Sequence, residues 1–361
     1  MSKLIGNYHS GKAEKQGLIW TICGKSFDKP VHVREALEAV KGNFMIDKCP
    51  LLVLTPDIKE KIRIGDITEE DLHNNTFTNR CATYRTDKNV PLGIVSPSYG
   101  IVQNSAAFEF IDLLCSGKDT DKDHTPVITN AGILGNGERV FITAKFPKSV
   151  ILENQNNDNI DMYIVFTNSH DGLGAVTGLV TPIRVWCNNT LALAMKDNSG
   201  KVTFRHTANV MQHLDLMKEE NRKFAYECLN IYNAYETYFK EKFEKLKNLK
   251  LAEADLDRIL AEVYLTNEEN EIYKKTNNFE VPEISNSNRK IIYKIKDCTV
   301  SGVGQNKENN GTALALINGV TTYYQNYRNY NSKDSKFRSI TEGKAKLNTQ
   351  KIFDLVNKLQ K

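Results

Sequence analysis

The stretch at 163–194 constrains the fold more than any other part of the chain. It opens with an apolar run, 163–166, that is typical of a buried strand, and a polar turn follows at 168–172. A β-branched segment, 175–186, leads to Cys187-Asn188-Asn189-Thr190 and then to good helix-forming residues. Since Asn and Thr oxygens accept hydrogen bonds from first-turn amides, this block is expected to cap a helix. The order strand, turn, strand and capped helix is predicted.

Two hairpin patterns and a helix pattern precede this stretch. The turn Gly135-Asn136-Gly137 joins two alternating segments, 127–134 and 139–146, and is a strong hairpin signal. Short strands are expected at 82–85 and 93–97 around a second turn, and an amphipathic helix at 105–115. Together these patterns predict an α+β fold, an antiparallel sheet backed by helices and followed by long helices and a helical C-terminal segment.

The pattern divides the chain of 361 residues into five segments. These are a mixed N-terminal segment (1–75), an α+β core (76–210), a long helical segment (211–265), a polar linker or insert (266–310) and a basic helical C-terminal region (311–361). Within the first segment we expect a strand at 17–23, a short helix at 30–40, a strand at 50–55 and a connector at 66–79.

Composition limits the class of protein. The seven cysteines are scattered and form no CxxC pair, which argues against a disulfide framework and a zinc ribbon. No apolar run reaches the roughly 18 residues of a membrane helix, so a cytoplasmic protein without membrane contact is expected. The net charge of +4 is uneven, because residues 321–361 alone carry about +6. Such a basic end favours contact with a polyanion, although solvated lysines are the commoner explanation.

Several blocks of the sequence resemble a known family. They are Tyr84-Arg85, residues 92–95, Tyr99, Asn104, Phe108, Gly132 with 137–141, residues 167–172, 184–191, 311–313 and 318–323, and Phe337. From about residue 80 to residue 350 the chain resembles the phage/plasmid-like proteins that contain domain of unknown function 932. The resemblance implies a product of a mobile element acting in a bacterial host cell. It implies no activity, because the family's function is unassigned.

Two sets of residues raise the question of catalysis. His170 with Cys187 and Asn188 has the residue types of a thiol hydrolase, but turn, cap and core roles also explain these residues. His170 and Asp171, with Asp161 or His206, could gather around a divalent ion in a metal-dependent nuclease. Metal-ligand spacings and a phosphate loop are both missing from the sequence. We therefore predict no catalytic residues, metal or cofactor, and read His170, Asp171, Cys187, Asn188 and Asn189 as family-motif residues.

Cations and aromatic residues point to single-stranded nucleic acid, whose binding needs positive charge along the phosphates and flat side chains for stacking. The predicted contacts are Arg139, Lys145, Arg184, Lys201 and Arg205 near the sheet, and Arg328, Lys336 and Arg338 in the tail, where tyrosines alternate with cations. The alternative for the tail is that its tyrosines form core and its lysines are solvated. The layout is also similar, at fold level, to Rad52-like annealing proteins.

The leading hypothesis is a non-enzymatic, homo-oligomeric protein that binds or anneals single-stranded DNA in recombination or replication. An anti-defence protein that binds a host protein is one alternative, and a metal-dependent nuclease is another. Neither the physiological partner nor the number of subunits follows from the sequence.

Overall fold

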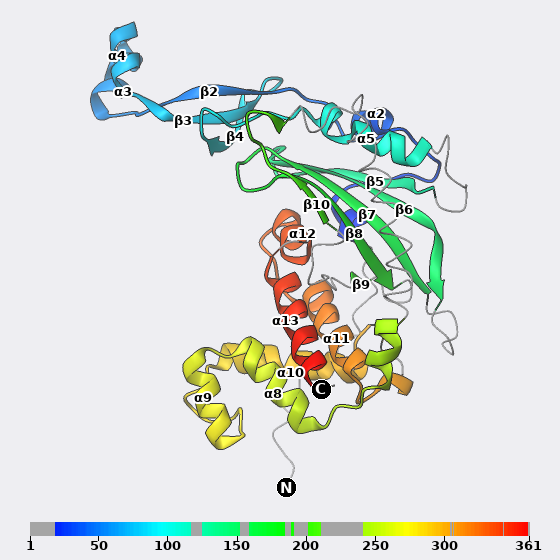
Figure 1. The fold of residues 1–361 in the computed structure, drawn as a ribbon. Helices are drawn as coiled ribbons and strands as arrows, with labels where there is room; N and C mark the ends of the chain where they lie inside the picture. The colour runs from blue at the N-terminus through cyan, green and yellow to red at the C-terminus, as the bar shows by residue number, and fades with distance from the viewer. Residues whose placement is uncertain are drawn as a thin grey trace.

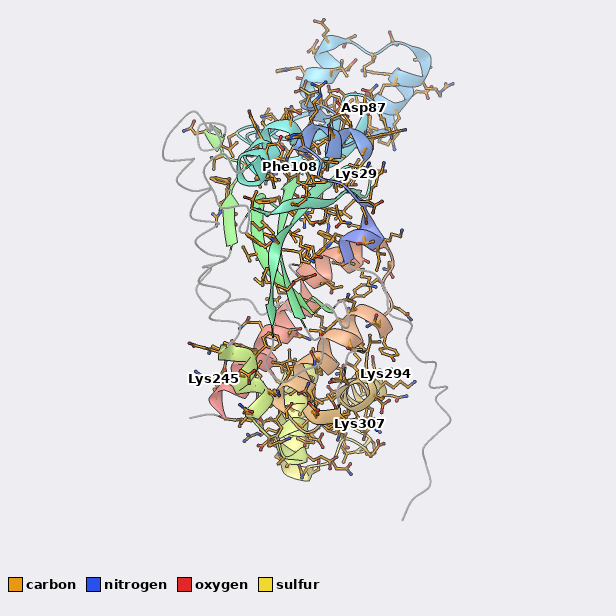
Figure 2. The ribbon with its side chains drawn as sticks, turned by 90° about the vertical axis from the view of Figure 1, so that its right-hand side faces the viewer. Lys29, Asp87, Phe108, Lys245, Lys294 and Lys307 are labelled. Atoms are coloured by element: carbon orange, nitrogen blue, oxygen red, sulfur yellow. The ribbon has the colours of Figure 1, made fainter. Side chains whose placement is uncertain are left out.

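The computed structural model describes residues 19–116, 125–151, 159–184, 189–190, 201–210, 241–303, 305, 307–341 and 343–359. Two antiparallel sheets form one half of the described molecule, and the C-terminal helices form the other (Figure 1). Figure 2, turned by 90°, shows the same division, with Phe108 in the sheet half and Lys245, Lys294 and Lys307 on the helical half. The predicted α+β class, with antiparallel strands and a helical C-terminal region, is confirmed.

The larger sheet has the strand order β1-β5-β6-β7-β8-β10, and β9 pairs with β8. Its strands are β1 (Lys25–Ser26), β5 (Val127–Leu134), β6 (Arg139–Ile151), β7 (Asn159–Ser169), β8 (Val176–Arg184), β9 (Asn189–Thr190) and β10 (Lys201–Phe204). The predicted hairpin between β5 and β6 is present, and Gly135 and Gly137 take the positive φ angles of 63° and 124° that its turn requires.

The smaller sheet has the order β2 (Ile46–Leu52), β3 (Thr76–Arg85) and β4 (Val90–Val95). Two short helices, α3 (Pro56–Ile64) and α4 (Glu69–Asn74), lie between β2 and β3. These elements form an arm that projects from the body (Figure 1). The expected connector at 66–79 is wrong, because the Thr68 capping box starts α4 there. Nor does the chain divide at residue 75, since β2 pairs with β3 across it.

Helices cover both faces of the larger sheet. The first face carries α2 (Val33–Ala39) and α5 (Asn104–Ser116), close to the sites expected from sequence, and the other carries α1 (Ile19–Cys23) and α12 (Lys333–Thr341). Phe141 of β6 stacks on Phe337 of α12 with ring centroids 4.8 Å apart. The strand expected at 17–23 is wrong for the residues that the structure describes, because Ile19–Cys23 forms helix α1. A short apolar run fits a buried helix as well as a strand, and here Ile19 and Trp20 are buried in α1.

The C-terminal half is built around α11 (Ala313–Thr322), all of whose residues are buried. Around it lie α8 (Glu253–Tyr264), α9 (Asn267–Thr276), α10 (Asn286–Ser301), a 3-10 turn (Lys307–Asn309), a π-helical turn (Tyr323–Tyr327) and α13 (Lys344–Lys358). The interpretation of 266–310 as a linker is therefore wrong. Most of its Asn and charged residues face solvent, while Tyr273, Ile292 and Ile295 are buried. The Glu269 carboxylate accepts from the Ser285 amide at 2.7 Å and thereby joins α9 to α10.

Some predicted features fall outside the described residues. Most of the long helical segment is among them, although 241–248 is helical and the chain leaves that helix before Lys250, which bridges to Thr312. Cys187, Asn188 and the helix expected at 191–195 also lie outside. Asn189 and Thr190 are described, and they form strand β9 instead of a helix cap. Within the described chain, no helix combines the length and apolarity needed to cross a membrane.

Candidate nucleic-acid interface

The turn after β7 is anchored by a buried polar network. Asn168 and His170 are at most 1% exposed. The Asn168 amide donates to the Asn104 side-chain oxygen at 3.0 Å, and His170 Nε2 lies 2.9 Å from the same oxygen. An amide oxygen can only accept, so His170 carries its proton on Nε2. Burial lowers the pKa of His170 to about 3, which keeps the ring neutral near pH 7. The network fixes the end of β7 to the start of α5.

The smaller sheet and the loop that follows it also hold the backbone of this turn. The Thr83 hydroxyl of β3 donates to the His170 carbonyl at 2.5 Å, and the Tyr99 hydroxyl donates to the Ser169 carbonyl at 2.9 Å. Gly93 of β4 approaches so closely that an added Cβ would collide with the Asp171 backbone. The turn is therefore a junction between the arm and the larger sheet, and its position is fixed.

Asp171 links this turn to the C-terminal half. Its carboxylate accepts from the Ser169 hydroxyl at 2.7 Å and the Leu173 amide at 2.8 Å, and forms an ion pair with Arg338 of α12 at 3.1 Å. Burial by itself would raise the pKa of Asp171, but these hydrogen bonds and the charges of Arg338 and Arg139 outweigh it and lower the pKa. Asp171 is thus a buried anion that holds a cation at the surface between the two halves.

A cationic cavity of about 570 Å³ opens beside this ion pair. We call it the arginine cavity; it is lined by Arg139, Leu173, Arg328, Asn329, Tyr330, Asn331, Ser335, Arg338, Ser339, Gly343 and Lys344. The Arg328 guanidinium lies 5.5 Å from the centre of the Tyr324 ring and 5.4 Å from that of Tyr330. Arg338 is paired with the carboxylates of Asp171 and Asp334, whereas Arg328 and Lys344 have no carboxylate partner in an ion pair of the described residues. These two side chains give the cavity its excess of positive charge.

The structure brings together three of the eight predicted contacts. Arg139 lies far from Arg328 and Arg338 in the sequence, yet all three line one cavity. Arg139 is only 2% exposed, so it belongs to the cavity wall and not to an open sheet surface as predicted. Tyr330 is one of the tail tyrosines that raised the hypothesis, whereas sequence reasoning did not single out Lys344 of the same basic tail as a contact.

The other predicted contacts lie elsewhere. Arg205 lines a neighbouring cavity of about 430 Å³ that shares Leu173 with the first. Lys145 forms an ion pair with Asp161 at 2.6 Å, which neutralises it. Lys336 is partly buried near Cys23, and burial lowers its pKa. Arg184 and Lys201 lie in β8 and β10, and their side chains are outside the described part.

The residues considered for a metal site have other partners. Asp161 accepts from Ser149 and pairs with Lys145, and His206 stacks on Tyr99 with ring centroids 4.7 Å apart. The Nδ1 atom of His206 donates to the Gly100 carbonyl at 2.9 Å. In the part of the chain that the structure describes, three or more His, Cys, Asp or Glu side chains nowhere gather at metal-binding distances.

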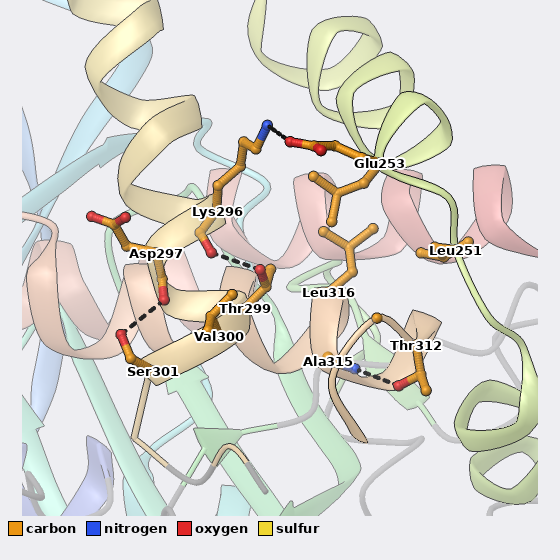
Figure 3. Close-up of a pocket in the computed structure, with 12 residues that line it drawn as sticks. Leu251, Glu253, Lys296, Asp297, Thr299, Val300, Ser301, Thr312, Ala315 and Leu316 are labelled. Carbon is orange, nitrogen blue, oxygen red and sulfur yellow. Dashed lines mark hydrogen bonds and ion pairs between the residues drawn. The ribbon is translucent and has the colours of Figure 1, made fainter. Parts of the chain in front are cut away.

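A further cavity of about 500 Å³ lies between α8, α10 and α11 (Figure 3). Lys296 forms ion pairs there with Glu253 at 3.2 Å and Asp257 at 2.7 Å. The Thr312 hydroxyl caps α11 by accepting from the Ala315 amide at 3.2 Å. Because two carboxylates neutralise Lys296, this cavity has no excess positive charge that would bind a polyanion.

The fold and the junction define an α+β protein with two antiparallel sheets, a helical C-terminal half and a cationic cavity where the halves meet. Residues 91–351 match the family model described as "Domain of unknown function (DUF932)". The match covers well over half of the chain, and the protein belongs to this family. Searches of curated proteins and of solved structures found no match. The turn after β7 and the arginine cavity both lie within the matched region, whereas α3 and α4 precede it.

Proposed function

We propose that this protein binds single-stranded nucleic acid and that the arginine cavity holds the phosphate backbone. The observation that carries the proposal is the convergence of Arg139, Arg328, Arg338 and Lys344 on one cavity from separate parts of the chain. Binding of a polyanion is driven by cations that replace its counterions. A guanidinium group also matches the geometry of a phosphate with two parallel hydrogen bonds.

A single strand also presents unpaired bases, and the aromatic rings beside Arg328 offer surfaces on which a base can stack. Tyr330 lines the cavity beside the Arg328 guanidinium, and its hydroxyl donates to the Tyr324 carbonyl at 3.0 Å. Stacking of a base on an aromatic ring contributes roughly 1–3 kcal/mol and depends little on the base. The lining amides and hydroxyls of Asn329, Asn331, Ser335 and Ser339 can bind phosphate or sugar oxygens. A mixed cationic, aromatic and polar lining suits a strand of any sequence.

The biological role in this proposal is that of a DNA-binding or annealing protein of a phage or plasmid. It would act in recombination or replication in the cytoplasm of the bacterial host. Binding through phosphates and stacked bases leaves the hydrogen-bonding edges of the bases free, and annealing requires those edges to find a complementary strand.

The test compares two double variants of the full chain by fluorescence anisotropy with a labelled single-stranded oligonucleotide. R328A with K344A removes two cavity cations that have no carboxylate partner in an ion pair of the described chain. R80A with K275A removes two exposed cations, from β3 and α9, that likewise have no carboxylate partner in an ion pair of the described chain, and is the matched control. We expect the cavity variant to bind at least tenfold more weakly and its salt dependence to fall by about 0.7 log units per lost phosphate contact. Equal binding by both variants would contradict the proposal.

The same assay separates the alternatives. With Mg²⁺ and with EDTA, the strand should remain intact, because the proposal assigns no catalytic step. Loss of full-length strand that requires Mg²⁺ and disappears in H170A would instead support a nuclease. Failure of the wild-type protein to bind any single strand at low salt would exclude nucleic acid and leave a host protein as the partner to seek.

A further inference from the structure

The end of the arm exposes an unusual amount of apolar surface. We call residues 53–77, which contain α3 and α4, the tip. Six of its large apolar side chains are 40–56% exposed, namely Val53, Leu54, Ile62, Ile64, Leu72 and Phe77. Ile58 is the single buried residue of the tip. Isolated apolar side chains are common on protein surfaces, but a group of this size on one small projection marks an interaction site.

Polar contacts hold the two tip helices together. The Lys61 ammonium, at the end of α3, pairs with Asp71 of α4 at 2.7 Å. The Thr68 hydroxyl and the Asp71 carboxylate form a capping box at the start of α4, and Thr55 caps α3. The usual arrangement is therefore inverted: polar groups join the helices, and apolar groups face solvent. The tip has a defined shape without using its apolar surface, so that surface is available to a partner.

The charge of the tip restricts the partner. The tip contains six acids (Asp57, Glu60, Asp66, Glu69, Glu70, Asp71) and three bases (Lys59, Lys61, Arg63), a net charge of −3. Nucleic acid and anionic lipid would be repelled by this surface. A protein surface that combines cations with exposed apolar side chains would complement it.

The outer face of α13 has these properties. Lys344, Leu347, Lys351 and Lys358 are exposed, and their spacing of three, four and seven residues aligns them along one side of the helix. Leu347 is 64% exposed. We call these four residues the α13 stripe. The tip and α13 lie far apart in both Figure 1 and Figure 2, so the tip of one molecule does not reach its own stripe.

We propose that the tip of one copy docks on the α13 stripe of a second copy. Such a contact joins two different surfaces, so each bound copy still presents one free tip and one free stripe. Repetition of this head-to-tail contact produces a closed ring or an open filament. Apolar contact around Leu347 would supply most of the affinity, and the acids of the tip against the lysines of the stripe would fix the orientation.

The test uses sedimentation velocity of the full chain over a concentration series, without nucleic acid. Wild type should form species larger than a dimer, and salt should weaken them. The tip variant (I62S with I64S) and the stripe variant (L347S with K351E) should each remain monomeric, with association weakened tenfold or more. An equimolar mixture of the two should form a dimer and nothing larger, because it contains one intact tip and one intact stripe. V300S, which changes a 65%-exposed residue of α10 outside both surfaces, is the control and should assemble normally.

Three results would overturn the proposal. The first is a wild-type protein that stays monomeric at the highest concentration. The second is loss of assembly in the tip variant alone, which would indicate symmetric pairing of two tips. The third is a mixture of the two variants that remains monomeric while each variant unfolds as cooperatively as wild type by circular dichroism. Each result is independent of oligonucleotide binding.

Discussion

The turn after β7 and the tip of the arm use polar side chains in opposite ways. At the turn, Asn168, His170 and Asp171 are buried, and each has hydrogen bonds or an ion pair. At the tip, the Lys61–Asp71 pair joins the two helices and a threonine caps each of them, while apolar side chains face solvent. Buried polar groups are costly when a partner is removed, whereas exposed apolar groups can be replaced with little effect on folding. The turn should therefore control stability, and the tip should control association.

Among substitutions at the turn, the largest effect is expected from D171A. It removes a buried carboxylate and leaves Arg338, and the nearby Arg139, without its negative charge. Removing one member of a largely buried ion pair typically costs at least about 3 kcal/mol of unfolding free energy. Urea denaturation measures this loss. D334A removes the other, more exposed partner of Arg338 and should cost less than about 1 kcal/mol. Equal losses for the two variants would show that Asp171 does not fix the junction.

A smaller effect is expected from G93A. The new methyl group would collide with backbone atoms of Asp171. Backbone atoms cannot move aside as the end of a flexible side chain can. Overpacking of this kind costs about 2 kcal/mol. G42A is the matched control, because its methyl group meets the ends of the Leu37 and Val40 side chains at 3.2 and 3.3 Å. Thermal unfolding should show a clearly lower midpoint for G93A than for G42A; a reversed order would contradict the close approach of β4 to the turn.

His170 should make stability depend on pH. Its pKa is about 3 in the folded protein and near 6.5 in the unfolded chain. Below pH 6.5 the unfolded chain therefore binds a proton that the folded protein does not, and stability falls as pH decreases toward 3. The contribution is up to about 1.4 kcal/mol per pH unit. Denaturation of wild type and H170Q from pH 7 to pH 5 should show this extra slope in wild type only. Parallel curves would mean that His170 is not buried as a neutral ring.

The smallest effect on stability is expected at the tip. I64S changes a 56%-exposed side chain and should alter the unfolding free energy by no more than about 0.5 kcal/mol. The same substitution at Ile142, which is fully buried in β6, should cost about 4 kcal/mol or more. Urea denaturation of both variants compares the two regions directly. A large loss for I64S would indicate that the tip folds around its apolar residues, contrary to the structure.

Local signals predicted the sheet half well. The glycines of the β5–β6 turn, the alternation on either side of it and the amphipathic pattern of α5 depend on residues close together in the chain, and the structure has all three elements. The Asn-rich region was misread because its helices bury few residues per turn. A stronger signal was present: Thr266 with Glu269 forms a capping box that marks the start of α9.

The candidate site was only partly predictable. Residue type and position in a basic tail pointed to Arg328 and Arg338, but spacing could not show that they meet Arg139. One partner of Asp171, Ser169, is two residues away in the sequence, but another, Arg338, comes from the C-terminal region. The exposed tip left no signal, because a run of apolar residues at 51–54 indicates a strand whether or not the fold buries it.

The most direct test of the central claim is to locate the bound strand. Photocrosslinking of the full chain to a single-stranded oligonucleotide that carries 5-iodouracil, followed by mass spectrometry of the peptides, identifies the aromatic residues next to the bases. The account predicts adducts on the peptide that contains Tyr330, and their loss in R328A with K344A. Adducts confined to other parts of the protein, unchanged in that variant, would contradict a nucleic-acid site at the arginine cavity.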